Sequence, residues 1–215
     1  MSRDTVVKKI SEVGVVAVIR ADQGEVLADV TQALLEGGVT AIEVTFTVPK
    51  AHKVLEHVAD RFGDQIQLGA GTVLDAETAR VAILAGAQFL VAPIVDTATI
   101  ELAHRYDKAI MPGALTPTEV VKAWQAGADV VKIFPSDLTG PGYLKALKGP
   151  LPQVRLMPTG GVNLDTAEAF LKAGACALGV GGSLVEKAAV DSRNWDRIRD
   201  LAAQYVEIVR RFRAK

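Results

Sequence analysis

The chain has 215 residues, of which 49% are hydrophobic and 23% are charged, and this balance excludes an intrinsically disordered protein. Lys and Arg total 24 against 25 Asp and Glu, giving a net charge of −1, so the chain lacks the basic excess that nucleic-acid binding needs. The single cysteine, Cys176, excludes an internal disulfide and indicates a reducing, cytoplasmic environment. No apolar run reaches the roughly 18 residues of a membrane span, so we expect neither a membrane nor a nucleic acid as partner.

Eight short apolar runs recur along the chain, after a segment over Asp4–Glu12 that has helical spacing. Apolar runs of this kind are typical of parallel strands buried on both faces. Successive runs begin 20 to 26 residues apart, which leaves room for one strand, one helix and two turns in each interval. In chain order they are Val15–Ile19, Ala41–Thr45, Ile66–Ala70, Phe89–Ala92, Ala109–Met111, Val130–Phe134, Val154–Met157 and Ala177–Val180.

Helical segments fill the intervals between the runs. Apolar residues recur at helical spacing over Gln23–Glu36 and over Pro117–Gln125, where Thr116 is the predicted N-cap, and a final helix is expected over Trp195–Phe212. This α/β pattern predicts one domain over residues 1–215, a single (β/α)8 TIM barrel with an extra N-terminal helix and a C-terminal helix. An open doubly wound sheet is the alternative, but it expects a glycine-rich turn where this chain has Arg20-Ala21-Asp22-Gln23.

Lys132 stands inside an apolar strand, in the phrase Val-Val-Lys-Ile-Phe-Pro. Burial removes water from an ammonium, which lowers its pKa and frees the amine as a nucleophile towards carbonyl groups. The alternative is a lysine whose head reaches solvent or pairs with a carboxylate. We favour the nucleophile, because perturbed lysines of this kind are concentrated at functional sites.

Glu43 is the second isolated charge in a predicted strand. Thr45 and Thr47 share its face at a period of two, so a polar stripe runs along this strand. A buried carboxylate of this kind is a candidate general base. An ion pair between Glu43 and Lys132 that only neutralises two buried charges is an equally good interpretation of the sequence.

Other candidates follow the strands at the end where barrels carry their function. Arg20 ends the first strand and can hold a carboxylate or phosphate with its fork of donors, although a rim salt bridge is an equal alternative. Thr72 follows Gly-Ala-Gly, where small residues let a ligand approach. The glycine-rich ends of the last two strands, Gly160-Gly161 and Gly181-Gly182-Ser183, predict a phosphate site, because barrels often bind phosphate there.

Metal chemistry is not favoured by the sequence. The three histidines, His52, His57 and His104, fall in segments expected to be exposed helices, and no metal-binding cluster of Cys and His is present in the sequence. Cys176 has no histidine near it in the sequence and is expected to be a buried filler. We therefore expect no metal site.

Several motifs together resemble the 2-keto-3-deoxy-6-phosphogluconate (KDPG) and 4-hydroxy-2-oxoglutarate (KHG) aldolases, a family that also includes 2-dehydro-3-deoxy-6-phosphogalactonate aldolases. The resemblance runs from about Val15 to Val185, with the motifs in matching order and spacing. These motifs are Glu43-Val44-Thr45, Gly69 to Leu74, Lys132-Ile133-Phe134-Pro135, Pro158 to Val162 and Gly181-Gly182-Ser183.

The resemblance implies a class I aldolase in which Lys132 forms a Schiff base with the substrate and Glu43 is the general acid and base, acting through a water. It also implies that the reaction needs no organic cofactor. It implies that Thr72, Pro93 and Phe134 line the pocket for the pyruvyl group. Phosphate would bind at Gly160, Gly161 and the Gly181-Gly182-Ser183 loop, and the protein would be a homotrimer. The expected reaction cleaves 2-dehydro-3-deoxy-6-phosphogluconate into pyruvate and D-glyceraldehyde 3-phosphate, with 4-hydroxy-2-oxoglutarate as a possible second substrate.

One position departs from many members of that family. They carry an arginine four residues after the base, where this chain has Thr47, and we expect Arg20 to bind the substrate anion instead. The galactonate epimer is an alternative substrate. Two further classes stay open on the sequence: a phosphate-binding barrel isomerase or synthase without a Schiff base, and a non-catalytic assembly subunit.

Overall fold

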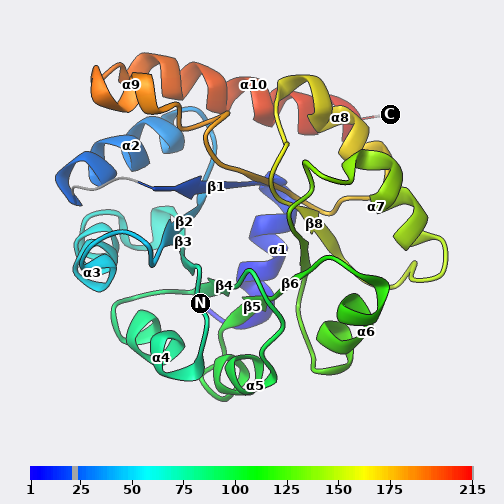
Figure 1. The fold of residues 1–215 in the computed structure, drawn as a ribbon. Helices are drawn as coiled ribbons and strands as arrows, with labels where there is room; N and C mark the ends of the chain where they lie inside the picture. The colour runs from blue at the N-terminus through cyan, green and yellow to red at the C-terminus, as the bar shows by residue number, and fades with distance from the viewer. Residues whose placement is uncertain (21–23, 215) are drawn as a thin grey trace.

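The computed structural model describes residues 1–20 and 24–214, so the turn after Arg20 and the first residue of the helix expected from Gln23 lie outside the described part. Ten α-helices and nine short strands alternate along that part, and Figure 1 shows the helices arranged around the strands. The strands are β1 Val15–Ile19, β2 Ala41–Thr45, β3 Gln67–Gly71, β4 Phe89–Val91, β5 Ala109–Met111, β6 Gly113–Ala114, β7 Val131–Ile133, β8 Leu156–Pro158 and β9 Leu178–Val180.

The helices follow the predicted order, including the extra helices at both ends. Local capping explains several of their starts: Thr116 and Glu119 form a capping box at α6, and Asn163 caps α8. The bounds are α1 Arg3–Val13, α2 Gly24–Glu36, α3 Ala51–Phe62, α4 Ala76–Leu84, α5 Thr97–Arg105, α6 Pro117–Gln125, α7 Gly140–Lys148, α8 Leu164–Lys172, α9 Lys187–Asp191 and α10 Trp195–Arg213.

The strands pair in parallel, which confirms an α/β fold, but they form two sheets where one eight-stranded barrel was expected. A six-stranded sheet has the order β5-β4-β3-β2-β1-β9, and a three-stranded sheet has the order β6-β7-β8. The division falls at Pro112, between β5 and β6, because proline has no amide hydrogen for the ladder. Isolated bridges, Leu156 with Ala175 and Thr159 with Gly179, connect the β8 side to β9.

Side chains of the strands alternate between two apolar clusters. Val15, Ala17 and Ile19 of β1 point outward and pack with the surrounding helices in the outer cluster. Val16 points the other way, into an inner cluster that α1 completes with Val6, Val7 and Ile10. The remaining inner-cluster residues are Ala41, Phe89, Val91, Ala109, Met111, Val130, Met157 and Ala177.

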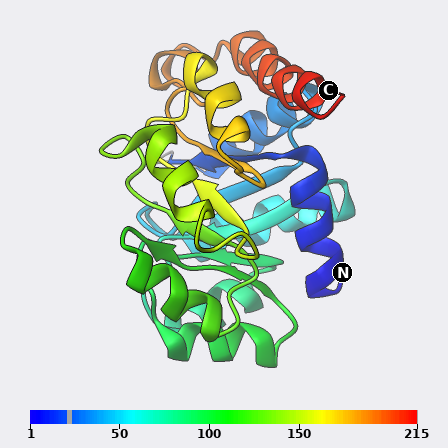
Figure 2. The same cartoon turned by 90° about the vertical axis from the view of Figure 1, so that its right-hand side faces the viewer.

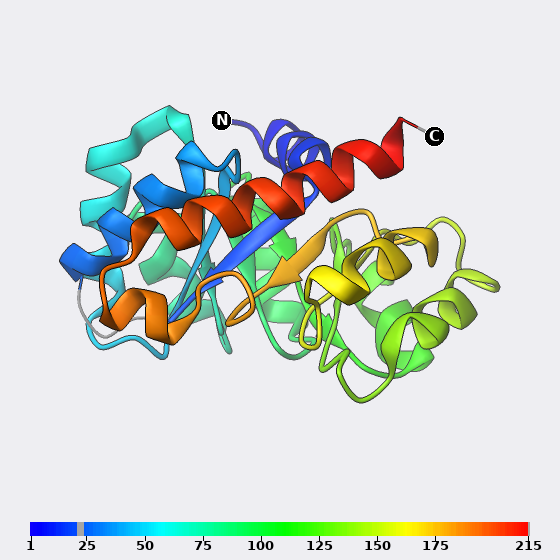
Figure 3. The ribbon, with the colours of Figure 1, turned by 90° about the horizontal axis from the view of Figure 1, so that it is seen from above.

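Helix α1 lies across the N-terminal ends of the strands, as Figure 2 shows. Helix α10 runs on the outside against α2 and α8, and both chain termini lie near the same end of the molecule in Figure 3. Because α1 belongs to the inner cluster, this cluster fills the space between the strands at their N-terminal ends. Inward-facing residues two positions further along each strand lie towards the C-terminal ends, where the polar candidates are found.

None of the helices in the described residues combines the length and apolar character needed to cross a membrane.

Candidate active site

Lys132 occupies the middle of β7 and is 6% exposed. Its neighbours Val131 and Ile133 belong to the outer cluster and Val130 to the inner cluster, so Lys132 points into the strand interior. Its Nζ lies 4.8 Å from the centroid of the Phe134 ring. Burial lowers the pKa of Lys132 below its usual value of 10.5, while Glu43 raises the pKa and Arg20 lowers it. The amine is therefore neutral at a lower pH than a surface lysine.

Glu43 faces the same interior from β2, where it pairs with Val18 of β1 and Gly69 of β3, and it is 1% exposed. Burial raises the pKa of Glu43 above 4.5, against smaller lowering effects of Lys132 and Arg20. Its Oε2 is buried without a hydrogen-bond partner, and within the described residues no direct ion pair within 4.0 Å joins it to Lys132. The sequence allowed an ion pair between Glu43 and Lys132, but the two side chains are not in direct contact. One oxygen of the Glu43 carboxylate therefore remains without a hydrogen-bond partner among the described residues.

Gly71, at the end of β3, makes room for the Glu43 carboxylate. A Cβ atom on Gly71 would lie 1.8 Å from Glu43 Oε1, far inside van der Waals contact. Sequence reasoning treated this glycine only as part of a turn, because its role depends on a side chain from the neighbouring strand. The pairing of Thr45 with Gly71 in the β2–β3 ladder fixes this approach.

The remaining strand-end candidates lie at the C-terminal ends of β1 to β4. Arg20 is exposed directly after β1, and the exposed Thr47 shares a 2.8 Å hydrogen bond with the buried Thr45 through their hydroxyl groups. Thr72 has φ 57°, a left-handed conformation that is costly for a β-branched residue and is often found at functional sites. The backbone of Pro93 packs closely on Gly113, since a Cβ added to Gly113 would lie 2.4 Å from the carbonyl carbon of Pro93.

A pocket of about 430 Å³ lies at the C-terminal ends of the strands. It brings together seven of the predicted residues, whereas Lys132, Glu43, Thr47, Thr72 and Pro93 are not part of its wall. Phe134 connects the two groups, because its ring lines the pocket and contacts Lys132. The wall consists of Val18, Arg20, Phe134, Thr159, Gly160, Gly161, Val162, Gly179, Gly181, Gly182, Ser183, Val185 and Lys187.

The two glycine-rich loops carry backbone amides without acceptors. Gly160 and Gly161 have φ values of 88° and 69°, and no described residue accepts a hydrogen bond from the amides of Gly160, Gly161, Gly182 or Ser183. The N-terminus of α8 is capped by Asn163, whose side chain accepts hydrogen bonds from the amides of Asp165 and Thr166. The amides that have no acceptor among the described residues are thus those of the loops, whereas Asn163 already occupies two amides of this helix.

Thr159 and Lys187 line the pocket but were not among the predicted residues. Thr159 is 8% exposed, and its buried Oγ1 has no hydrogen-bond partner in the part of the chain that the structure describes. This oxygen packs against Gly179, where a Cβ would lie 2.2 Å from it. Lys187 begins α9 and forms an ion pair with Asp191, with Nζ 2.8 Å from a carboxylate oxygen. Thr159 lies in the motif Pro158 to Val162, in which only the two glycines indicated a phosphate site. No local sequence signal distinguished Lys187 from the other lysines in helices.

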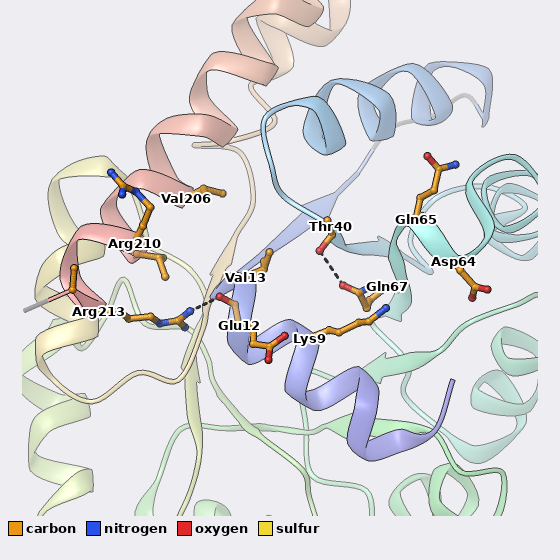
Figure 4. A pocket seen from close by; sticks show the side chains of 12 residues that line it. Lys9, Glu12, Val13, Thr40, Asp64, Gln65, Gln67, Val206, Arg210 and Arg213 are labelled. Atoms are coloured by element: carbon orange, nitrogen blue, oxygen red, sulfur yellow. Dashed lines mark hydrogen bonds between the residues drawn. The ribbon is translucent and has the colours of Figure 1, made fainter.

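A second pocket, of about 680 Å³, opens at the opposite end of the strands, between α1 and α10 (Figure 4). There Thr40 donates a hydrogen bond to Gln67, and the Arg213 guanidinium donates to the carbonyl of Glu12. None of the predicted site residues lines this pocket. The candidate chemistry is therefore confined to the C-terminal ends of the strands.

Potential metal ligands are scattered. In residues 1–20 and 24–214, no three His, Cys, Asp or Glu side chains are grouped as a metal site would need. All three histidines were expected on exposed helices, but only His57 is exposed, and His52 and His104 are half-buried. His104 Nε2 lies 3.8 Å from Asp129 Oδ2. Burial raises the pKa of the Cys176 thiol to about 11, which makes it a poor nucleophile at neutral pH.

Comparison with known proteins supports the family that the motifs suggested. A family model described as KDPG and KHG aldolase matches residues 6–201. The 2-dehydro-3-deoxy-6-phosphogalactonate aldolase of Escherichia coli (strain K12) is 32% identical over 179 residues, which cover 83% of this chain and 85% of that protein. The 2-dehydro-3-deoxy-phosphogluconate aldolase of Pseudomonas aeruginosa is 32% identical over 198 residues, covering 91% of this chain and 89% of that protein.

Solved structures agree with the sequence relatives. A KDPG aldolase from Legionella pneumophila, crystallised with pyruvate captured as a covalent carbinolamine intermediate, matches with a TM-score of 0.83 and 28% identity, over 90% of this chain and 95% of that one. A chain of a protein cage designed by fusing symmetric oligomeric domains matches with a TM-score of 0.84 and 31% identity, over 94% of this chain and 73% of that one. With its family model matched over most of its length, the chain belongs to the KDPG and KHG aldolase family.

Proposed function

We propose that this protein is a class I aldolase that cleaves 2-dehydro-3-deoxy-6-phosphogluconate into pyruvate and D-glyceraldehyde 3-phosphate. The observation that carries the proposal is the buried Lys132 of β7, whose pKa is lowered and is coupled to that of the buried Glu43 of β2. An amine whose pKa is lowered and a carboxyl whose pKa is raised are the two groups that Schiff-base aldol chemistry needs. The carbinolamine of the Legionella pneumophila relative supports covalent chemistry in this family.

The proposed reaction begins when the neutral Lys132 amine attacks the C2 carbonyl of the substrate. The resulting carbinolamine loses water and becomes an iminium, which accepts the electron pair of the C3–C4 bond as that bond breaks. Glu43 removes the proton of the C4 hydroxyl at this step, so the aldehyde D-glyceraldehyde 3-phosphate leaves. The Oε2 atom of Glu43 is buried and has no hydrogen-bond partner among the described residues, which supports this role.

An enamine of pyruvate then remains on Lys132. Glu43 helps return a proton to C3, and addition of water to the iminium releases pyruvate and restores the free amine. Since the iminium is the electron sink, the reaction needs neither a metal nor an organic cofactor. Activity is accordingly expected to persist after dialysis against EDTA.

The substrate groups are assigned to the candidate residues at the C-terminal ends of the strands, some of which lie outside the pocket wall. Many family members have an arginine where this chain has Thr47, and here Arg20 binds the substrate carboxylate instead. Thr72, Pro93 and Phe134 surround the pyruvyl group. The phosphate binds at Gly160, Gly161 and the Gly181-Gly182-Ser183 loop. Their free amides support this assignment, because such amides cradle phosphate oxygens.

The proposal is tested by the release of pyruvate from the phosphorylated keto acid, followed by NADH oxidation through lactate dehydrogenase. Wild-type protein should release pyruvate, and Lys132→Met should reduce the rate to background. Lys122→Met, on the exposed side of α6, is the matched control and should retain full activity. Equal rates for Lys132→Met and wild type would refute the role of Lys132.

The C4 epimer is a second candidate substrate. Relatives that act on the galactonate and gluconate forms are both 32% identical to this chain, so identity does not favour either. The same assay with both phosphorylated epimers and with 4-hydroxy-2-oxoglutarate decides between them through kcat/KM. A barrel isomerase or synthase would release no pyruvate from any of the three.

We also propose that the two sheets form one closed (β/α)8 barrel and that the protein is a homotrimer in the cytoplasm. The isolated bridges between the β8 side and β9, together with the shared inner cluster, support closure. The match to a cage built from symmetric oligomeric domains supports an oligomer. Sedimentation equilibrium tests the trimer, which predicts three times the chain mass of 22.7 kDa.

A further inference from the structure

Two cations with different surroundings line the pocket at the C-terminal ends of the strands. Arg20 and Lys187 are the charged side chains of its wall, and no carboxylate lines it among the described residues. Arg20 directly follows β1, whose Val18 pairs with Glu43 in the β1–β2 ladder, so it lies on the side of the buried pair. Lys187 belongs to α9, which follows the Gly181-Gly182-Ser183 loop. The wall thus attracts anions at two places.

The backbone brings Lys187 beside that loop. The amides of Leu184 and Val185 both donate hydrogen bonds to the carbonyl of Gly181, at 2.9 and 3.0 Å, so the chain turns back before α9 begins. The amides of Gly182 and Ser183 donate to no described residue. A lysine therefore lines the same pocket as two amides that can bind an anion.

The ammonium of Lys187 is held by a contact that a ligand can replace. Its Nζ lies 2.8 and 3.0 Å from the two carboxylate oxygens of Asp191, and the side chains are 88% and 59% exposed. An exposed pair at this helical spacing contributes little to stability, because water screens it. A phosphate dianion carries about twice the charge of a carboxylate and accepts more hydrogen bonds.

We propose that Lys187 is a specificity-determining residue, whose ammonium exchanges Asp191 for the phosphate of the substrate and so selects phosphorylated keto acids over unphosphorylated ones. The inference rests on the proposed function and adds a residue of this chain to its phosphate end. Asp191 then competes with the phosphate for the same ammonium. A helix-stabilising pair without contact to substrate is the structural alternative.

The experiment compares KM and kcat for the phosphorylated keto acid and for 4-hydroxy-2-oxoglutarate, together with competitive inhibition by inorganic phosphate. In Lys187→Met we expect KM for the phosphorylated substrate and the inhibition constant of phosphate to rise about tenfold, as for loss of one charge-assisted hydrogen bond. KM for 4-hydroxy-2-oxoglutarate should not change. Lys187→Arg should restore most of the loss, and Asp191→Asn should make phosphate inhibit more strongly.

The control is Lys172→Met on α8, which removes an ion pair of the same kind, with Glu168 at 3.0 Å, away from the pocket. It should leave all constants unchanged. Unchanged phosphate inhibition in Lys187→Met, or an equal rise in KM for both substrates, would overturn the inference. Borohydride trapping with pyruvate, which has no phosphate, separates the two proposals. If the wild-type protein forms no trapped adduct, the proposed function is contradicted. If trapping is normal but phosphate inhibition is unchanged in Lys187→Met, only this inference is contradicted.

Discussion

The carboxylate of Glu43 lies against the Cα of Gly71, so closely that a Cβ at position 71 would be 1.8 Å from Oε1. Glu43 is buried and its Oε2 has no hydrogen-bond partner among the described residues, so the space that this glycine leaves open contributes to the position of the carboxylate. The proton-transfer geometry of the proposed reaction therefore depends on a residue that carries no functional group.

Gly71→Ala should displace the Glu43 carboxylate and lower kcat by about 100-fold, the effect typical of a displacement of about 1 Å in a catalytic group. Schiff-base formation with pyruvate should persist, because Lys132 is not displaced. Gly142→Ala is the control, since a Cβ there meets no atom within 4 Å. Full activity of Gly71→Ala would show that the carboxylate position is not critical.

The proposed tuning of Lys132 predicts opposite shifts in two variants. The rate of Schiff-base formation with pyruvate should rise with pH to a midpoint below 10.5, because burial lowers the pKa of Lys132. Arg20→Ala should move the midpoint up, since Arg20 lowers this pKa, and Glu43→Gln should move it down, since Glu43 raises it. Borohydride-quenched time courses between about pH 6 and pH 11 measure the midpoints. Shifts in the same direction in both variants would contradict the electrostatic account.

Arg20→Ala also tests anion binding directly. If Arg20 holds the substrate carboxylate, its loss should raise KM about tenfold or more, the effect expected for a charge-assisted hydrogen bond. Steady-state kinetics with the phosphorylated keto acid measure this change. Unchanged KM and kcat would exclude Arg20 from substrate binding.

Removal of the Glu43 charge should stabilise the fold while it abolishes activity. The pKa of Glu43 is raised above 4.5, so between 4.5 and the raised value the folded state binds more protons than the unfolded state. The free energy of unfolding contributed by this group therefore falls as pH rises through that window. Glu43→Gln lacks this loss, so its stability advantage over wild type should grow with pH in urea titrations. The exposed Glu56→Gln is the control; an advantage that shrinks with pH would contradict the assignment.

Thr159 lines the pocket, and its buried hydroxyl has no hydrogen-bond partner among residues 1–20 and 24–214. If a polar group of the substrate binds it, Thr159→Val should lower kcat/KM by about 3- to 10-fold, the value of one neutral hydrogen bond, without loss of stability. Thr31→Val removes a comparable buried hydroxyl on α2 and should affect only stability. Equal kcat/KM for Thr159→Val and wild type would exclude the contact.

Much of this fold was predictable, because its strands are local apolar runs. The structure reproduces β1 and β2 at the predicted residues, whereas β8 begins two residues later, at Leu156. Val154 is instead part of a turn, with its amide bonded to the carbonyl of Leu151. Pro158 was expected to follow this strand, but it is the last residue of β8 and pairs with Ile133 of β7. Proline has no amide hydrogen to donate, and the amide of the next residue, Thr159, donates to the carbonyl of Ile133.

The site was predictable only in part. Lys132 and Glu43 are isolated charges in apolar strands, and that contrast is visible in a single chain. The contributions of Gly71, Thr159 and Lys187 depend on contacts with residues from other segments or on placement at a shared pocket. The division at Pro112 was missed for a similar reason, since the run Ala109–Met111 does not show which neighbour the chain pairs with after the proline.

Borohydride reduction of the wild-type protein with pyruvate, followed by peptide mass spectrometry, tests the central claim most directly. The account predicts one reduced pyruvyl adduct per chain, located on Lys132 and absent from Lys132→Met. Absence of an adduct in the wild type, or an adduct on another lysine, would contradict the proposed Schiff-base mechanism.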